Sequence, residues 1–238
     1  MLTLTAVSLF AHRGLHDESR PRNSLAAHVA AADAGYGIEL DIQLSRDGVP
    51  IVSHDPNTVH DTGVFRSIEA TAAAAITELV FTGTELHLIT LETLLAHVPP
   101  SVPLLVEIKP THRVHEVVDA VARLLSARSD AVALQSFHPR IVRAARQRHP
   151  QFLTGQLGEA PSSALPLARR LHAMTLASNA FVRPQFLALE VSTLSAPAAV
   201  FWRRRLHAPL LAWTVTTAEQ VRACQLEGAG MIFEGFRP

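Results

Sequence analysis

The stretch GIELDIQLSRDGVPIVSHD, residues 37–55, contains two apolar runs separated by the turn-forming pair Asp47-Gly48. Apolar and polar residues alternate through the first run, which is typical of a β-strand with one buried apolar face. A parallel crossover needs a dozen or more residues, so these two runs can pair only as an antiparallel hairpin. If Arg46 pairs with Val49, the register sets Asp41 opposite His54, with Cβ atoms about 4.5–5.5 Å apart.

Outside this hairpin, short apolar runs alternate with helical stretches rich in Ala, Leu and Arg, which indicates βα units around a parallel sheet. The expected strands are 6–11, 37–42, 49–53, 103–108, 131–136, 152–157, 187–191, 209–215 and 230–233. The expected helices are 24–34, 67–79, 91–97, 113–127, 139–148, 163–172, 196–206 and 217–227. Asn23 is expected to cap the first helix and Gly35 to end it. Without the hairpin's second arm, the strands predict an α/β fold, the TIM (β/α)8 barrel.

Composition narrows the class of protein. The 238 residues carry 21 basic and 21 acidic side chains, and this balance argues against a nucleic-acid partner. No apolar run reaches the roughly 18 residues of a membrane span, and we interpret residues 1–10 as leading into a first strand and not as a signal peptide. Cys224 is the single cysteine, so no internal disulfide is expected and a cytoplasmic location is predicted. No linker is visible, and we expect one domain over residues 1–238.

Two pairs of charged residues lie on or at the end of predicted strands. Glu39 and Asp41 are two residues apart and share the strand face that points into the barrel, where desolvation and repulsion favour a bound cation. Glu107 and Lys109 repeat this spacing and add a third carboxylate beside an ammonium group. Oxygen ligands indicate one divalent cation, Mg²⁺ or Ca²⁺, and do not distinguish the two. A solvated acidic strand and a buried Glu107–Lys109 ion pair remain as alternatives.

Histidines are frequent in this chain, with 13 in total, and those on predicted helices, such as His28, are expected to be solvated or half-buried. His12 and His54 differ because each ends a strand at the level of the carboxylates. A histidine pair can divide the roles of acid and base near neutral pH. Arg13 beside His12 suits an anionic oxygen such as phosphate. Lys109 is the only lysine among the 21 basic residues, which indicates a site where a compact ammonium is needed.

The chain resembles the glycerophosphodiester phosphodiesterase family over nearly its whole length. The matching segments are Ala11-His12-Arg13-Gly14, Asn23-Ser24-Leu25-Ala26-Ala27, residues 38–50, Ser53-His54-Asp55, Glu107-Ile108-Lys109, Ser136-Phe137 and Trp213-Thr214-Val215. The resemblance implies a TIM barrel with a small lid insertion at about 57–89. It also implies the site residues: Glu39, Asp41 and Glu107 on a divalent ion, His12 and His54 as acid and base, and Arg13 and Lys109 on the phosphate.

Three positions depart from the family pattern. Arg22 stands where the family has Glu before Asn, and Asp61 lies near the place of a family Arg. The last strand ends in Phe233-Glu234, where the family has Thr-Asp. These departures concern the alcohol groups of the substrate more than the reacting centre.

The predicted activity is metal-dependent hydrolysis of a small-molecule glycerophosphodiester to glycerol phosphate and an alcohol. Phe137 and Trp213, at their strand ends, are candidates for the substrate pocket. The nucleophile is either water or the neighbouring hydroxyl of the glycerol. The alternatives are a sphingomyelinase D-like phospholipase or lyase, and a catalytically silent barrel that binds a phosphorylated ligand or a protein. The oligomeric state is not predicted.

Overall fold

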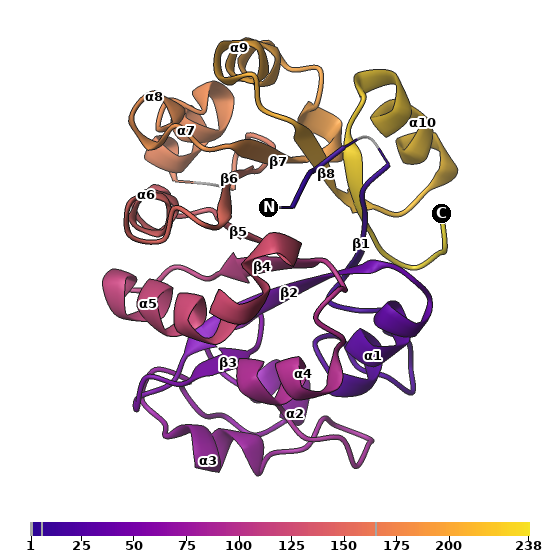
Figure 1. Cartoon of the computed structure of the whole chain (residues 1–238), viewed down its shortest axis with the longest axis vertical. Coiled ribbons are helices and arrows are strands. Elements are labelled where there is room, and N and C mark those ends of the chain that lie inside the picture. The colour runs from indigo at the N-terminus through magenta and orange to yellow at the C-terminus, as the bar shows by residue number, and fades with distance from the viewer. Residues whose placement is uncertain (1, 6, 165) are drawn as a thin grey trace.

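Eight parallel strands close into a barrel surrounded by helices in the computed structural model, which describes residues 2–5, 7–164 and 166–238 (Figure 1). The barrel order is β1-β2-β4-β5-β6-β7-β8-β9, and β1 closes it by pairing with both β2 and β9. The strands are β1 (Leu9–His12), β2 (Gly37–Leu44), β3 (Pro50–Val52), β4 (Leu104–Ile108), β5 (Val132–Ser136), β6 (Leu153–Gly158), β7 (Phe186–Glu190), β8 (Leu210–Val215) and β9 (Gly230–Phe233). The TIM-barrel prediction is therefore confirmed.

Helices cover the outside of the barrel and pack on its apolar outer face. The α-helices are α1 (Leu25–Asp33), α2 (Val59–Thr62), α3 (Ala73–Thr77), α4 (Leu91–His97), α5 (Val114–Leu125), α6 (Pro139–Arg148), α7 (Leu167–Thr175), α8 (Asn179–Val182), α9 (Pro197–Leu206) and α10 (Ala218–Glu227), with 3-10 turns η1 (Ser126–Ala131) and η2 (Val191–Thr193). Ile38, Leu40 and Ile42 belong to the main core beneath these helices and are fully buried. The intervening Glu39 and Asp41 therefore point into the barrel.

The interior of the barrel holds two aromatic rings, each beside a glycine on the next strand. Phe10 of β1 pairs with Gly37, and Phe186 of β7 pairs with Gly155. A Cβ atom on Gly37 would lie 2.6 Å from the Phe10 ring, and one on Gly155 would lie 2.2 Å from the Phe186 ring. Each ring thus occupies the space that a neighbouring side chain would need.

The hairpin register differs from the prediction by one residue. β3 runs antiparallel to β2 with Leu44 opposite Pro50, so the backbone of Asp41 accepts a hydrogen bond from Ser53 N at 3.0 Å and not from His54. The loop has three residues, 46–48, in place of two, because Gly48 adopts a φ of 79° and adds the extra residue. The expected pairing of Asp41 with His54 is therefore wrong.

The insertion after β3 packs beside the barrel. Its small core joins Ile68, Ile76, Phe81 and Leu88 to Ile51 of β3, and α2 and α3 lie at the bottom of Figure 1. The expected helix 67–79 is wrong except for α3, because Ala72 is extended and Ser67 forms a β-bridge with Asn57. That this segment acts as a lid over the mouth of the barrel remains a prediction.

The largest remaining differences between predicted and observed element ends are at β1 and α7. β1 begins at Leu9 and not at residue 6, and Ala6 lies outside the described residues. The helix expected at 163–172 is α7, which follows its N-cap residue Pro166, and Leu165 likewise lies outside the described residues. Among the helices that are described, none is long and apolar enough to cross a bilayer.

We expect Gly155→Ala to destabilise the protein by about 1–3 kcal/mol, because the new methyl overlaps the Phe186 ring in a filled interior. Urea denaturation gives the free energy of unfolding. Phe186→Leu supplies the control, since the smaller side chain vacates the contested space. The double variant should lose less free energy of unfolding than the sum of the losses in the two single variants. Strictly additive losses would contradict this packing.

Candidate active site

Three buried carboxylates converge where β2 and β4 end. Asp41 and Glu107 are direct neighbours across these strands, and Glu39 lies two residues before Asp41. One oxygen from each of the three lies within 4.8 Å of the others. Their exposed fractions are 2%, 1% and 6% for Glu39, Asp41 and Glu107. The strand register thus brings together the three acids that the sequence singled out.

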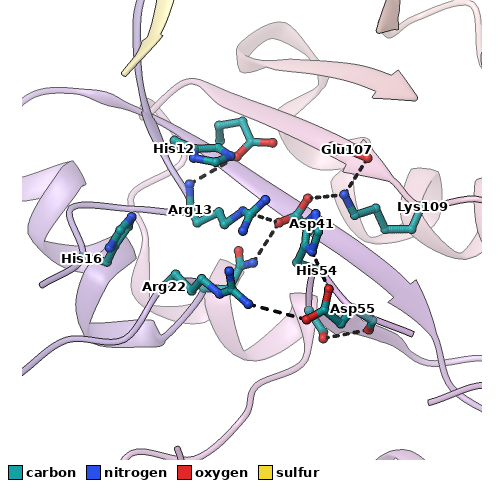
Figure 2. A network of polar contacts seen from close by, with 12 residues as sticks. His12, Arg13, His16, Arg22, Asp41, His54, Asp55, Glu107 and Lys109 are labelled. Atoms are coloured by element: carbon teal, nitrogen blue, oxygen red, sulfur yellow. Dashed lines mark hydrogen bonds and ion pairs between the residues drawn. The ribbon is translucent and has the colours of Figure 1, made fainter. Parts of the chain in front are cut away.

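Asp41 is the most heavily contacted of these acids (Figure 2). Lys109 Nζ lies 2.9 Å from Asp41 Oδ1, and Arg13 Nε lies 3.0 Å from Oδ2. Asn23 Nδ2 donates a second contact to Oδ2 at 2.9 Å. The main chain of Arg13 also donates to Glu39 Oε2 at 3.2 Å. Groups from three separate segments therefore fix one carboxylate.

The loop after β1 reaches this carboxylate through an unusual backbone. Arg13 and Asn23 both have positive φ angles, 55° and 60°, and Asn23 N donates to Arg13 O at 3.0 Å. The predicted role of Asn23 as the cap of the first helix is wrong. Ser24 is the cap and accepts from Ala27 N, because the left-handed turn at Asn23 directs its amide to Asp41.

The three carboxylates differ in how readily they ionise. Burial, together with the charges of Asp41 and Glu107, raises the pKa of Glu39 well above its usual range. Burial and Asp41 raise the pKa of Glu107 to about 7. Burial by itself would also raise the pKa of Asp41, but Lys109 and Arg13 outweigh it and hold that pKa below its usual range. The two local cations thus compensate Asp41 and leave the other acids short of positive charge.

This shortage fits a divalent cation. The donor set is entirely carboxylate oxygen, which suits hard ions such as Mg²⁺ and Ca²⁺. An added cation beside Glu39 and Glu107 would favour their ionised forms and lower both pKa values. The residues present therefore fit the metal that the family resemblance implies.

The sequence left two roles open for Lys109, an ion pair with Glu107 or a contact with the phosphate of a ligand. Its Nζ lies 2.7 Å from Glu107 Oε1 and bridges that residue to Asp41. Burial opposes its charge, but the two carboxylates outweigh burial and raise the pKa of Lys109. The Glu107–Lys109 ion pair, which the sequence analysis kept as an alternative, is present in the structure, and contact of Lys109 with phosphate stays a prediction.

His12 is oriented by a carboxylate that sequence reasoning treated only as a departure. Glu234, directly after β9, lies with its Oε2 2.5 Å from His12 Nδ1 and its Oε1 3.3 Å from His16 Nε2. Hydrogen bonds with these two imidazoles hold the pKa of Glu234 below its usual range. Burial lowers the pKa of His12 despite this partner, so the neutral imidazole is favoured.

His54 has a carboxylate partner of its own. Its Nδ1 lies 2.7 Å from Asp55 Oδ1, and burial lowers the pKa of the imidazole. Arg22 Nη2 lies 3.5 Å from Asp55 Oδ2 and also 3.5 Å from Asp61 Oδ1. The two unusual residues Arg22 and Asp61 are therefore neighbours, with charges reversed relative to the family pattern.

His28 on α1 differs from its prediction. It is fully buried and not solvated, and neither ring nitrogen has a hydrogen-bond partner among the residues that the structure describes. Burial lowers its pKa to about 3, so this imidazole is neutral. Helix periodicity did not predict this burial, because α1 is covered by the barrel on one side and by the loop at Gly14 on another. The loop is so close that a Cβ atom added to Gly14 would lie 2.8 Å from His28 N.

The site opens into a cavity of about 220 Å³. Its wall contains both histidines, the two cations Arg13 and Lys109, and the acids Glu39 and Glu107. Phe137 and Trp213 form another part of the wall and pack edge to face with ring centroids 5.5 Å apart. All but one of the predicted site residues line this cavity, and the exception, Asp41, lies beneath it under Arg13 and Lys109.

Four residues of the site were missed as contributors. Asn23, Asp55 and Glu234 each contact a predicted site residue, and Gln135 lines the cavity with a buried, unpartnered Oε1. Glu234 and Gln135 carried a usable signal, because each lies at or near a strand end on the inward face. Asn23 stands in a segment that resembles the family, but it was interpreted as a helix cap, a role for which its neighbour Ser24 is equally suited by type.

Known proteins resemble this chain in sequence and in fold. Rat glycerophosphodiester phosphodiesterase 1 is 52% identical over 58 residues, which are 24% of this chain and 17% of the relative. This chain thus aligns with less than a fifth of that relative's length. A phosphodiesterase from Oleispira antarctica, solved with its product sn-glycerol-3-phosphate, superposes with a TM-score of 0.80 at 20% identity, covering 95% and 92% of the two chains.

A glycerophosphodiester phosphodiesterase from Thermotoga maritima superposes with a TM-score of 0.75 at 24% identity, covering 95% and 94%. These likenesses establish the shared barrel. The family model for glycerophosphoryl diester phosphodiesterases matches residues 12–234, a span that begins at His12 and ends at Glu234. The chain therefore belongs to the glycerophosphoryl diester phosphodiesterase family.

Proposed function

We propose that this protein hydrolyses glycerophosphodiesters to glycerol phosphate and an alcohol with the help of one divalent cation. The observation that supports this most strongly is the shared cavity, where two acids, two cations and two carboxylate-paired histidines meet, with Asp41 completing the acidic cluster outside the wall. Family membership points to the same reaction. The single cysteine, buried Cys224, is in keeping with a proposed cytoplasmic location.

The phosphate group of the substrate would lie against the cations of the cavity. Arg13 and Lys109 present positive charge to it, and their contacts with Asp41 hold them in place before substrate arrives. A divalent cation held by Glu39, Asp41 and Glu107 would polarise the phosphoryl oxygens as a Lewis acid. Preorganised charge of this kind lowers the barrier because negative charge develops on these oxygens in the transition state.

His12 and His54 would move the protons. Each ring places Nδ1 against a carboxylate, Glu234 or Asp55, so that nitrogen carries the hydrogen and Nε2 is left for the cavity. A neutral Nε2 can accept the proton of the attacking hydroxyl, and the other imidazole, once protonated, can donate to the leaving oxygen. Both histidines have the same arrangement, with Nδ1 against a carboxylate. We therefore assign acid and base catalysis to the pair without saying which histidine is the acid and which is the base.

Removal of divalent ions should abolish hydrolysis. We expect EDTA to stop release of glycerol phosphate from glycerophosphocholine, and Mg²⁺ or Ca²⁺ to restore it, as followed by a coupled glycerol-phosphate assay. The same ions should raise the melting temperature of the wild type, because a ligand of the native state stabilises it. Glu39→Gln should lose both responses. Full activity in EDTA would contradict metal dependence.

Replacement of either histidine should slow the reaction strongly. We expect His12→Ala and His54→Ala to lower kcat by a factor on the order of 10²–10⁴, the usual contribution of a general acid or base. Circular dichroism checks that the variants fold, and His97→Ala, on the exposed end of α4, is the matched control. A cyclic phosphate product would identify the glycerol hydroxyl as the nucleophile. A folded His12→Ala variant with normal turnover would overturn the assignment.

Arg22 should act on the reaction through Asp55 and His54. We expect Arg22→Glu to lower kcat/KM about tenfold and to raise the acid-limb pKa of the rate profile, because a carboxylate replaces a cation near the imidazole. Adding Asp61→Arg should recover most of the loss, since it restores opposite charges across the contact. Arg222→Glu on exposed α10 is the control. Equal losses in the single and double variants would show that the two charges are not coupled.

A further inference from the structure

The 220 Å³ catalytic cavity continues into a second cavity of about 750 Å³, which we call the annex. The two share five wall residues, and these lie at the reacting end: His54, Glu107, Lys109, Phe137 and Leu157. The annex volume is in the range of pockets that hold a small organic ligand. A substituent on a phosphate bound beside Lys109 can therefore extend into the annex.

Beyond the shared residues, the annex wall is mostly apolar. Three segments at the carboxyl end of the barrel each contribute a proline: Pro56 in the loop after β3, Pro110 in the loop after β4 and Pro139 at the start of α6. Proline has no backbone N–H, so these segments offer no donor at those positions. The far side is formed by Ala168 and Ala173 of α7 and by Leu176 just after it.

The polar residues of the annex do little to change this character. Gln43 uses its Nε2 to donate to His54 O at 3.0 Å. Burial lowers the pKa of His138 and of His172, so both imidazoles are neutral near pH 7. Glu159 is the one residue outside the shared end that brings a formal charge to the described wall. Charge is thus concentrated at the catalytic end.

We propose that the annex binds an apolar chain carried by one substituent of the phosphodiester, so that the preferred substrates are amphiphilic. This inference rests on the proposed phosphodiesterase activity. A small polar alcohol buried in the annex would lose its hydrogen bonds to water and find few replacements. An alkyl chain gains by leaving water, and each buried methylene adds about fourfold to kcat/KM. The chain belongs either to an acyl group on the glycerol or to the alcohol.

The test compares three substrates under one metal condition. Glycerophosphocholine has no chain, hexanoyl lysophosphatidylcholine has the chain on the glycerol, and the hexyl ester of glycerol phosphate has it on the alcohol. We expect one of the two chain-bearing substrates to have a kcat/KM at least about tenfold above that of glycerophosphocholine, because two or more methylenes are buried. Whichever is favoured identifies the source of the chain.

The variant Ala168→Glu introduces a charge at an exposed helix position of the annex wall. We expect it to lower the ratio of chain-bearing to chainless kcat/KM by about tenfold, since an alkyl chain then lies against a carboxylate. Ala75→Glu on α3, which is exposed and lines neither cavity, should leave the ratio and the basal rate unchanged. An unchanged ratio in Ala168→Glu would contradict the annex as the chain site.

The outcomes separate this inference from the proposed function. Equal kcat/KM for all three substrates would overturn the inference and leave the phosphodiesterase activity standing. Failure to hydrolyse any of the three with Mg²⁺ or Ca²⁺ present would overturn the proposed function, and with it the inference. A chain preference that disappears in Ala168→Glu and persists in Ala75→Glu would support both.

Discussion

The negative charge of Asp41, buried at the top of the barrel, is the constraint on which the site depends. A buried carboxylate is costly unless it is paired and fully hydrogen-bonded. Here Arg13, Asn23 and Lys109 supply the compensation, from the β1 loop, the entry to α1 and the end of β4. Their convergence ties three segments of the chain to one point of β2. Loss of Arg13 or Lys109 would leave negative charge uncompensated, which typically costs about 3–5 kcal/mol for a buried ion pair. Loss of Asn23 would remove a hydrogen bond from the same buried carboxylate.

The two cations compensate the charge of Asp41 but not the charges of Glu39 and Glu107. Glu39 and Glu107 keep raised pKa values because burial and mutual repulsion exceed the help they receive from the same two cations. An apolar trio at these positions would stabilise the barrel more than three acids can. Folding alone does not explain a cluster of this kind, and a bound cation would relieve the repulsion between its carboxylates. The Phe10 and Phe186 layer below supplies the apolar packing that the acidic layer lacks.

Local patterns predicted the parts of the fold that depend on one element at a time. Alternation along β2 identified the inward face of Glu39 and Asp41, since strand geometry fixes it without reference to neighbours. The hairpin register required knowledge of φ at Gly48, which decides between two and three loop residues, and a change of one residue alters every cross-strand pair. Asn23 failed as a predicted cap for a related reason. Its positive φ accompanies a hydrogen bond to Asp41, which lies 18 positions away in the sequence.

The residues that depart from the family pattern show why motif differences are best judged in three dimensions. Arg22 and Asp61 are 39 positions apart in sequence, and each alone suggests an altered mouth. Their side chains lie 3.5 Å apart, so the two charges attract each other, with signs reversed relative to the pattern that the resemblance implies. Coulomb energy depends on the product of two charges, and reversal of both leaves that product unchanged. What does change is the field at Asp55, which now faces a cation. Arg22 thus reaches the site through Asp55, the carboxylate that pairs with His54.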